Sequence, residues 1–175
     1  TPIYPPLGLA YLAGYVRQFG IDVKIIEANA LDLTHQQIKQ EIDAYKPDFL
    51  ALSASSSLME EVEKLTKLTP DKCIVILGGI HASSMPEQVL KDYPRIDFVV
   101  RGEGEETIRH IINSELLENI DGISYRKNGK IMHNKDSKFI ENLDALPFPA
   151  RDLLPMHKYF SFEARRYPID YIVSG

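Results

Sequence analysis

Short apolar runs alternate with segments of helical periodicity over the first 114 residues, and this alternation is the strongest constraint on the fold. Continuous apolar runs of this kind are typical of strands that helices cover on both faces. Short connections between strand and helix favour parallel strands. The sequence therefore predicts an α/β, Rossmann-like (flavodoxin-like) doubly wound parallel sheet. Its expected strands are residues 23–26, 49–52, 73–77 and 96–100.

Local signals place the helices between these strands. Helical spacing begins near Leu9 and ends at Gly20, a residue type that commonly follows the last turn of a helix. Two capping boxes, in which a Ser or Thr side chain and a Glu or Gln three residues later satisfy backbone N–H groups, predict further helix starts. They are Thr34 with Gln37, and Ser57 with Glu60. Later helices are expected from Pro86 and from Thr107.

The central strand that opens a flavodoxin-like sheet has no counterpart before the first expected helix. Either that strand precedes Thr1 or another segment replaces it. Residues 171–173 are the only late apolar stretch that no expected element uses.

The character of the sequence changes after about Ser114. Asn128-Gly129 separates two strand-like runs, 120–125 and 130–133, and is a strong signal for a β-hairpin. Residues 139–155 follow, with prolines spaced among apolar side chains, and we expect this segment to dock on the protein rather than to move freely. We predict a domain at 1–114 and, at 115–175, the hairpin with a linker.

Composition excludes several classes of partner. The net charge is −5 with no cationic block, which gives no support for nucleic-acid binding. No apolar run approaches the roughly 18 residues of a membrane span. The one cysteine, Cys73, lies in an apolar run and has no partner within the sequence for a disulfide. This fits a reducing compartment, so we expect a cytoplasmic protein.

Glycine and small polar residues gather where the expected strands end. In a doubly wound sheet a ligand lies outside the carboxyl ends of the strands. The loops expected at that edge are residues 29–32, 53–57, 78–84 and 102–106. Glycine pairs there remove side chains and leave a flat rim of backbone, which suits a large planar ligand or a phosphate. His81 follows the first glycine pair and either contacts a ligand or hydrogen-bonds its own loop.

The common catalytic motifs are missing from the sequence. The serines at 53–57 are not surrounded by the Gly-x-Ser-x-Gly elbow of a nucleophile. No Cys or His cluster has the spacing of a zinc site. The stretch 102–107 is not Gly-x-Gly-x-x-Gly, because Thr107 occupies the third glycine position. The glutamates at 103, 105 and 106 either interact favourably with the dipole of the helix that follows or contact a ligand.

Five short motifs, in this order and spacing, resemble the N-terminal cobalamin-binding domain of cobalamin-dependent radical S-adenosylmethionine enzymes. The family includes methyltransferases and the anaerobic magnesium-protoporphyrin monomethyl ester cyclases. The motifs are PPLGLAYLA at 5–13, GGIHA at 78–82, DFVVRGEGE at 97–105, ISYR at 123–126 and LPFPARD at 146–152. The last two resemble the link into the radical domain.

The resemblance implies that cobalamin lies across the carboxyl edge of the sheet and that its nucleotide tail enters the domain. The loop at residues 6–8 would approach the corrin, the serines would hydrogen-bond near the tail, and the first glycine pair would let the tail pass. The expected cofactor-binding residues are Pro6, Leu7, Gly8, Asn29, Ser53, Ser55, Ser56, Gly78, Gly79, His81, Gly102, Glu103, Gly104 and Glu105.

Two departures from related proteins shape the expected chemistry. The string Asp-x-His-x-x-Gly, whose histidine ligates cobalt in other cobalamin domains, does not occur. The cysteine motif C-x-x-x-C-x-x-C of the iron–sulfur cluster does not occur either. We therefore expect a domain that is not catalytic by itself, in a parent protein that also uses S-adenosylmethionine and an iron–sulfur cluster for methyl transfer or tetrapyrrole modification.

Two alternatives remain open on the residues alone. The same fold could act as an interaction module that binds no cofactor. It could also bind a small nucleotide or a flavin, which would call for aromatic side chains at the ligand loops, where Tyr4 and Tyr11 are the nearest candidates.

Overall fold

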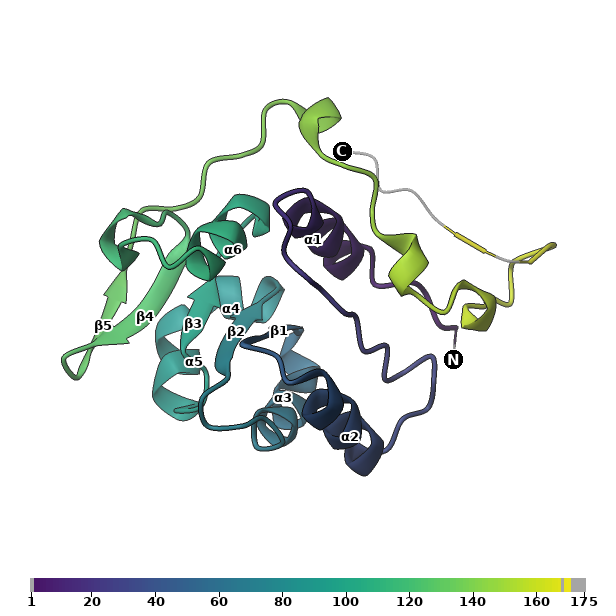
Figure 1. Cartoon of the computed structure of the whole chain (residues 1–175), viewed down its shortest axis with the longest axis horizontal. Coiled ribbons are helices and arrows are strands. Elements are labelled where there is room, and N and C mark those ends of the chain that lie inside the picture. The colour runs from purple at the N-terminus through teal and green to yellow at the C-terminus, as the bar shows by residue number, and fades with distance from the viewer. Residues whose placement is uncertain (1, 168, 171–175) are drawn as a thin grey trace. The chain divides into compact units, whose positions relative to one another are not determined.

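A computed structural model describes residues 2–167 and 169–170 of the chain (Figure 1). It contains two compact units. One consists of Thr1–Ile38 and Asp144–Gly175, and the other of Lys39–Leu143. Residues 171–173, considered above as a replacement strand, lie outside the described residues. Within the part that is described, no helix has the length and apolarity needed to cross a membrane.

A five-stranded mixed sheet forms the centre of the second unit, in the order β1-β2-β3-β4-β5. Strands β1 to β3 are parallel, and β3, β4 and β5 are successively antiparallel. The antiparallel part is the predicted hairpin, which extends the sheet beyond β3. The strands are β1 (Phe49–Ser53), β2 (Ile74–Gly78), β3 (Phe98–Val100), β4 (Ile123–Lys127) and β5 (Lys130–His133).

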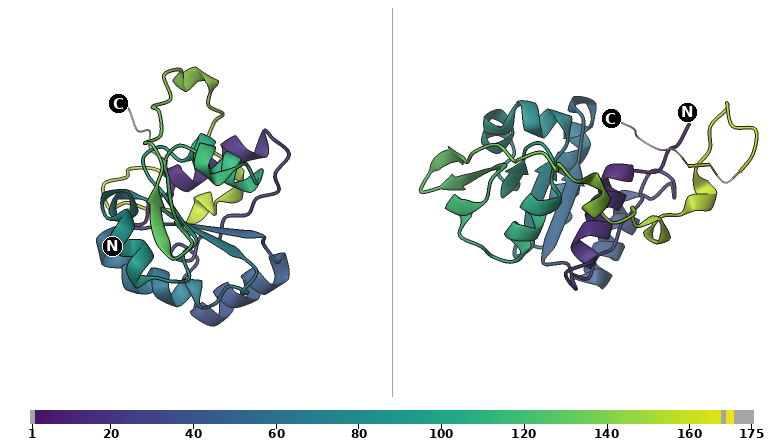
Figure 2. Two further views of the ribbon diagram at one scale, coloured as in Figure 1. Left: turned by 90° about the vertical axis from the view of Figure 1, so that its left-hand side faces the viewer. Right: turned by 90° about the horizontal axis from the view of Figure 1, so that it is seen from above.

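Helices cover both faces of this sheet (Figure 2). Three of them, α3 (Met59–Thr66), α4 (Ile80–Ser84) and α5 (Pro86–Asp92), pack on one face. Because side chains alternate along a strand, β2 directs Val75 and Leu77 into this core and Ile76 to the other face. Helix α6 (Glu105–Ile112) lies on that other face.

The carboxyl ends of the parallel strands meet at one edge, as the sequence predicts for three of its four expected loops. Residues 29–32, the fourth, follow no strand in the described structure. Ser53 and Gly78 are direct partners in the ladder between β1 and β2. Val100 ends β3, the next strand along. Because of this register, the loops that follow the three strands begin side by side.

The first unit is organised around α1 (Leu7–Arg17). Leu7, Ala10, Ala13 and Val16 form its buried stripe. After the helix, Gly20 adopts a φ of +74°, which favours glycine.

The chain at residues 148–152 docks on α1, as expected for this apolar segment. The N–H of Ala150 donates to the Ala10 carbonyl at 2.8 Å. Arg17 forms an ion pair with Asp152 at 2.8 Å. A Cβ at Gly14 would lie 2.7 Å from the Phe148 carbonyl oxygen, so the contact requires glycine at that position.

Helix α2 (His35–Tyr45) starts at the predicted capping box. The N–H of Thr34 donates to the Gln37 side chain at 2.9 Å, and the N–H of Gln37 donates to the Thr34 hydroxyl at 3.3 Å. The second predicted capping box is wrong. Ser56–Leu58 forms a short 3-10 turn, α3 starts only at Met59, and no side chain caps it.

Two other expectations need correction. Residues 23–26 form no strand in the described structure, because no neighbouring strand offers them backbone hydrogen bonds. Instead, Ile25 packs against the buried cluster of Ala10, Leu154 and Tyr159. The stretch 78–84, expected as a loop, contains α4, a helix too short to give a clear periodic pattern.

Candidate functional site

The candidate site is the rim formed by the three loops that follow β1, β2 and β3. They contribute the serines at 53–57, the stretch Gly78 to His81, and the stretch Arg101 to Glu105. All of these residues belong to the unit that contains the sheet.

Gly79 has a backbone conformation that essentially only glycine adopts. Its φ is +98° and its ψ is 177°. This region of φ and ψ is closed to residues with a Cβ. A Cβ at Gly79 would also lie 2.8 Å from the Ala54 carbonyl oxygen and 3.1 Å from the Ser53 hydroxyl. The loop after β1 therefore touches the backbone of the loop after β2, and glycine makes this approach possible.

Gly78 has room for a Cβ at the end of β2. A Cβ there would meet only the carbonyl oxygens of Val100 and Leu52, at 3.9 and 4.0 Å, which are ordinary contacts. Apart from its chain neighbours, no described side chain has an atom within 4 Å of this Cβ position. Gly78 and Gly79 thus serve different purposes: the first leaves room above the edge, and the second permits the turn.

A hydrogen bond joins the first two loops across the rim. The Ser56 hydroxyl lies 2.9 Å from Nδ1 of His81. This bond joins His81 to the loop after β1 and not to its own loop, as one of the two expected roles had it. Ligand contact by His81 stays a prediction. Nearby, the hydroxyls of Ser55 and Ser57 are 3.1 Å apart. Ser53, Ser55 and Ser56 are all exposed, so their hydroxyls are accessible to a ligand.

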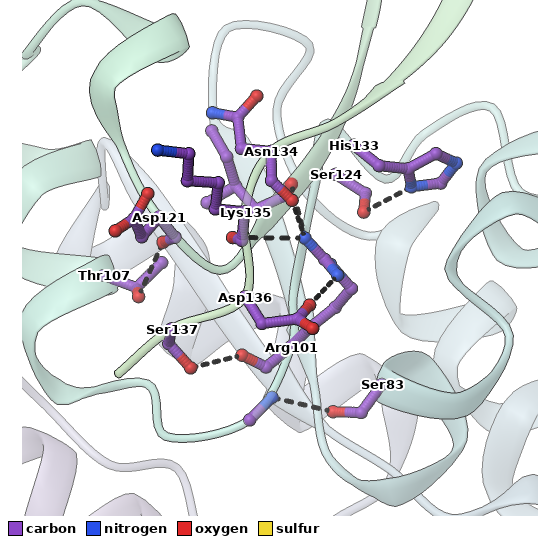
Figure 3. A network of polar contacts seen from close by, with 12 residues as sticks. Ser83, Arg101, Thr107, Asp121, Ser124, His133, Asn134, Lys135, Asp136 and Ser137 are labelled. Carbon is purple, nitrogen blue, oxygen red and sulfur yellow. Dashed lines mark hydrogen bonds and ion pairs between the residues drawn. The ribbon is translucent and has the colours of Figure 1, made fainter. Parts of the chain in front are cut away.

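The third loop is held by residues far away in the sequence (Figure 3). The guanidinium of Arg101 contacts Asp136 and the carbonyl of Asn134, and its side chain is only 15% exposed. The N–H of Gly102 donates to the Ser83 hydroxyl at 3.2 Å. The Ser137 hydroxyl donates to the Arg101 carbonyl at 3.0 Å. These contacts hold the loop in place through groups of the protein itself.

The acidic residues of this loop have distinct surroundings. Glu103 accepts a hydrogen bond from the N–H of Ile140 at 2.6 Å. Gly104 precedes the first turn of α6, which begins at Glu105. Burial raises the pKa of Glu105, and the negative charge of Glu103 raises it further. Glu103 therefore anchors the chain after the hairpin, whereas the raised pKa of Glu105 makes this carboxyl harder to ionise.

An apolar side chain stands out on the rim. Ile80, the first residue of α4, is 83% exposed. Together with the glycine backbone and the serine hydroxyls, it provides apolar, flat and polar surfaces at one edge. A corrinoid ring with amide side chains and a phosphate-linked tail needs such a set. The residues of the rim therefore fit cobalamin.

The remaining predicted residues belong to the other unit. Pro6 precedes the first turn of α1, Leu7 is 5% exposed with its side chain in the core, and Gly8 has open space around it. Asn29 is exposed and begins a turn, in which the N–H of Asp32 donates to its carbonyl at 3.2 Å.

A protein metal cluster is not found at any of these places. Among residues 2–167 and 169–170, no group of three or more His, Cys, Asp or Glu side chains could hold a metal ion.

Comparison with known protein families identifies the family of this chain. A family model described as the B12 binding domain matches residues 1–112. The chain belongs to the B12-binding domain family. The match covers α1, the parallel strands and all three loops of the rim.

The similar proteins are cobalamin-dependent radical enzymes and their relatives. An uncharacterized methyltransferase of Pyrococcus horikoshii is 41% identical over 89% of this chain. The anaerobic magnesium-protoporphyrin IX monomethyl ester cyclase of Rubrivivax gelatinosus is 32% identical over 89%. The radical enzyme OxsB, solved with aqua-cobalamin and S-adenosylmethionine bound, aligns with a TM-score of 0.72 and 26% identity over 87% of this chain. The Rossmann-like fold is thus the B12-binding fold of such enzymes.

The chain spans only part of each of these proteins. It covers 35% of the Pyrococcus protein, 30% of the Rubrivivax cyclase and 22% of the OxsB chain.

The sequence patterns did not predict the long-range contacts that hold the third loop of the rim. Arg101 was seen only as part of a motif, and Ser83, Asp136 and Ser137 carried no signal. Their partners lie 19 to 36 positions away in the sequence, beyond any local pattern.

Proposed function

We propose that this chain binds cobalamin at the rim formed by the loops after β1, β2 and β3. The supporting observation is the pair Gly78 and Gly79. At Gly78 a Cβ would meet only backbone oxygens, at ordinary contact distances, and Gly79 lets two loops approach without side chains. In this proposal the nucleotide tail passes Gly78, and the hydroxyls of Ser53, Ser55 and Ser56 hydrogen-bond near it.

The other predicted residues complete the proposed site. His81 supports the serine loop through Ser56. Gly102, Glu103, Gly104 and Glu105 border the opposite side of the rim. Pro6, Leu7, Gly8 and Asn29 stay predicted contacts and belong to the other unit.

We further propose that the chain presents the corrinoid to a radical S-adenosylmethionine domain of a longer parent protein. When bound, cobalamin supplies a cobalt centre that can carry a methyl group or exchange electrons. The longer relatives support methyl transfer or tetrapyrrole modification as the parent activity, with S-adenosylmethionine as a further cofactor. An iron–sulfur cluster in the parent protein is part of the same proposal. The single cysteine supports our placement of the protein in a reducing cytoplasm.

The main alternative is an interaction module of the same fold that has lost its ligand. Such a module would be expected to fill the edge with bulky side chains. At Gly78, apart from its chain neighbours, no described side chain comes within 4 Å of the Cβ position, which argues against it.

The substitution Gly78→Leu tests the proposal directly. The glycine has room for a Cβ and no positive φ, so the protein should fold while the longer side chain blocks the tail. We expect cobalamin to bind roughly tenfold more weakly or worse, the effect of losing about 1.4 kcal/mol. The measurement is the dissociation constant for hydroxocobalamin from an absorbance titration, with circular dichroism to check folding.

Gly129→Asn is the matched control. It also adds a side chain at a glycine, but in the hairpin turn, where a Cβ meets nothing and Asn tolerates the φ of +74°. It should bind like the wild type. Equal affinity of Gly78→Leu and wild type would place the cofactor elsewhere.

A further inference from the structure

Residues 134–140 run along the third loop of the rim, and Figure 3 shows the first four of them beside Arg101. We call residues 134–140 the strap. It follows β5 in the sequence, whereas the third loop follows β3. Both belong to the unit that contains the sheet. The strap also lies after residues 1–112, the region that the B12-binding family model matches.

The Arg101 guanidinium holds the first part of the strap. It donates to the carbonyl oxygen of Asn134 and, at 3.4 Å, to that of Lys135. It also forms an ion pair with Asp136, whose side chain is 88% exposed, so water weakens this pair. The backbone carbonyls are therefore the main attachment. Contacting several acceptors at once suits the planar fork of an arginine.

Ser137 packs against the backbone of two glycines. A Cβ at Gly102 would lie 2.7 Å from the Ser137 hydroxyl oxygen, and a Cβ at Gly122 would lie 2.9 Å from the Ser137 Cβ. Both glycines have a positive φ, +73° and +79°, which favours glycine. The Ser137 hydroxyl also donates to the Arg101 carbonyl at 3.0 Å. A side chain at either glycine would therefore force the strap away from the loop.

Two further hydrogen bonds secure the strap near its ends. Near its start, the Lys135 carbonyl accepts the N–H of Gly122 at 2.7 Å. At its end, the N–H of Ile140 donates to the Glu103 carboxylate at 2.6 Å. The strap thus contacts each of residues 101–103. Gly102 and Glu103 are predicted cofactor contacts, so a ligand at the rim would meet a loop whose shape depends on the strap.

We propose that Arg101 is a positioning residue of the cobalamin site, which fastens the strap to the third loop and so couples order in the strap to cofactor binding. This inference rests on the proposed function. It extends the site beyond the region of the family match, residues 1–112. The coupling is reciprocal: if an ordered strap favours cobalamin binding, bound cobalamin must favour the ordered strap by the same factor.

The first test is hydrogen exchange of the strap in the full 175-residue chain, with and without hydroxocobalamin. We expect exchange in the 134–140 peptide to slow when cobalamin is bound. The amide of Ile140 should report this most clearly, because its N–H donates to Glu103 on the third loop. Unchanged exchange in the strap of a wild type that binds cobalamin would overturn the inference.

The second test is Arg101→Lys, which keeps the positive charge but replaces the planar fork by a single ammonium. A loop that is less often held by the strap raises the apparent dissociation constant by the inverse of the competent fraction. We expect a rise of roughly threefold or more for hydroxocobalamin, the value when about one third of the molecules are competent. Without cobalamin, the 134–140 peptide should exchange faster than in the wild type.

Ser137→Ala is a milder variant for the case that Arg101→Lys does not fold. It removes only the hydroxyl that donates to the Arg101 carbonyl and leaves the space between the two glycines unchanged. We expect weaker cobalamin binding and faster exchange in the strap, both by a smaller factor than in Arg101→Lys.

Arg95→Lys is the matched control. The Arg95 guanidinium also donates to two backbone carbonyls, those of Pro70 and Cys73, at 2.6 and 2.7 Å. These residues precede β2 and β3, at the edge of the sheet opposite the rim. The variant should lower the free energy of unfolding in urea and leave cobalamin affinity unchanged. If it weakened binding as much as Arg101→Lys, general destabilisation would explain both and the inference would be wrong.

The outcomes separate this inference from the proposed function. Wild-type affinity in folded Arg101→Lys, or in Ser137→Ala if Arg101→Lys does not fold, would overturn the inference alone. A folded wild type that does not bind hydroxocobalamin would overturn the proposed function as well.

Discussion

At the scale of single residues, the two adjacent glycines at the end of β2 have different tasks. Gly79 is required by its backbone, since its φ of +98° and ψ of 177° exclude a Cβ. At Gly78 a Cβ would make only ordinary contacts, so the backbone does not require glycine there. We propose that Gly79 serves the fold and Gly78 serves cofactor binding, and a substitution at each can separate the two roles.

Gly79→Ala should destabilise the fold. A backbone conformation of this kind costs of order 1–3 kcal/mol for a residue with a side chain. The clash with the Ala54 carbonyl at 2.8 Å adds to that cost. The measurement is the free energy of unfolding in urea, and a value at or above that of the wild type would show that the loop relaxes freely.

Gly78→Ala is the control for this prediction. Its added Cβ makes only contacts of 3.9 Å or more, so the free energy of unfolding should change by less than about 1 kcal/mol. If both alanines destabilised the protein equally, the distinction drawn between the two glycines would be wrong.

The glycines were visible in the sequence, whereas the contacts of the third loop were not. A glycine pair after an apolar run is a local pattern. In contrast, Glu103 accepts its hydrogen bond from Ile140, 37 positions away. Such pairing depends on how the hairpin returns to β3, which no local spacing encodes.

At the scale of elements, the two predicted capping boxes had opposite outcomes. Thr34 and Gln37 form the reciprocal bonds that open α2. Ser57 instead lies in a 3-10 turn and contacts Ser55. The serine-rich loop thus uses its hydroxyls among themselves and with His81, and α3 starts one residue later than the pattern indicated.

Thr34→Ala should therefore destabilise the protein, by about 0.5–2 kcal/mol, the usual effect of losing an N-cap. Ser57→Ala should be nearly neutral, because this exposed hydroxyl caps no helix. Thermal unfolding of both variants compares them directly. A larger loss in Ser57→Ala than in Thr34→Ala would contradict the assignment of the caps.

The strand predicted at residues 23–26 shows the limit of an apolar pattern. The pattern reports that the segment is partly buried, and Ile25 does pack against a buried cluster. An apolar pattern does not show whether a second strand lies beside the segment, and a β-strand requires such a pairing partner.

At the scale of the whole molecule, helix–strand alternation correctly predicted the α/β class and the edge where the three loops meet. The hairpin was also predicted, but its pairing with β3, which makes the sheet mixed, was not. Periodicity identifies strands, whereas the order of strands is decided by packing between distant segments.

The predicted cofactor contacts belong to both compact units, with the rim in one and the loop at residues 6–8 and Asn29 in the other. Local patterns marked each of them, but their joint role in cobalamin binding stays a prediction.

The most direct test of cobalamin binding is a titration of the purified chain with hydroxocobalamin, followed by gel filtration and the visible spectrum. We predict co-elution of about one equivalent with a base-off spectrum, because the tail is held by the protein and the sequence lacks the Asp-x-His-x-x-Gly histidine. A chain that circular dichroism shows to be folded, but that elutes without cobalamin, would contradict the account.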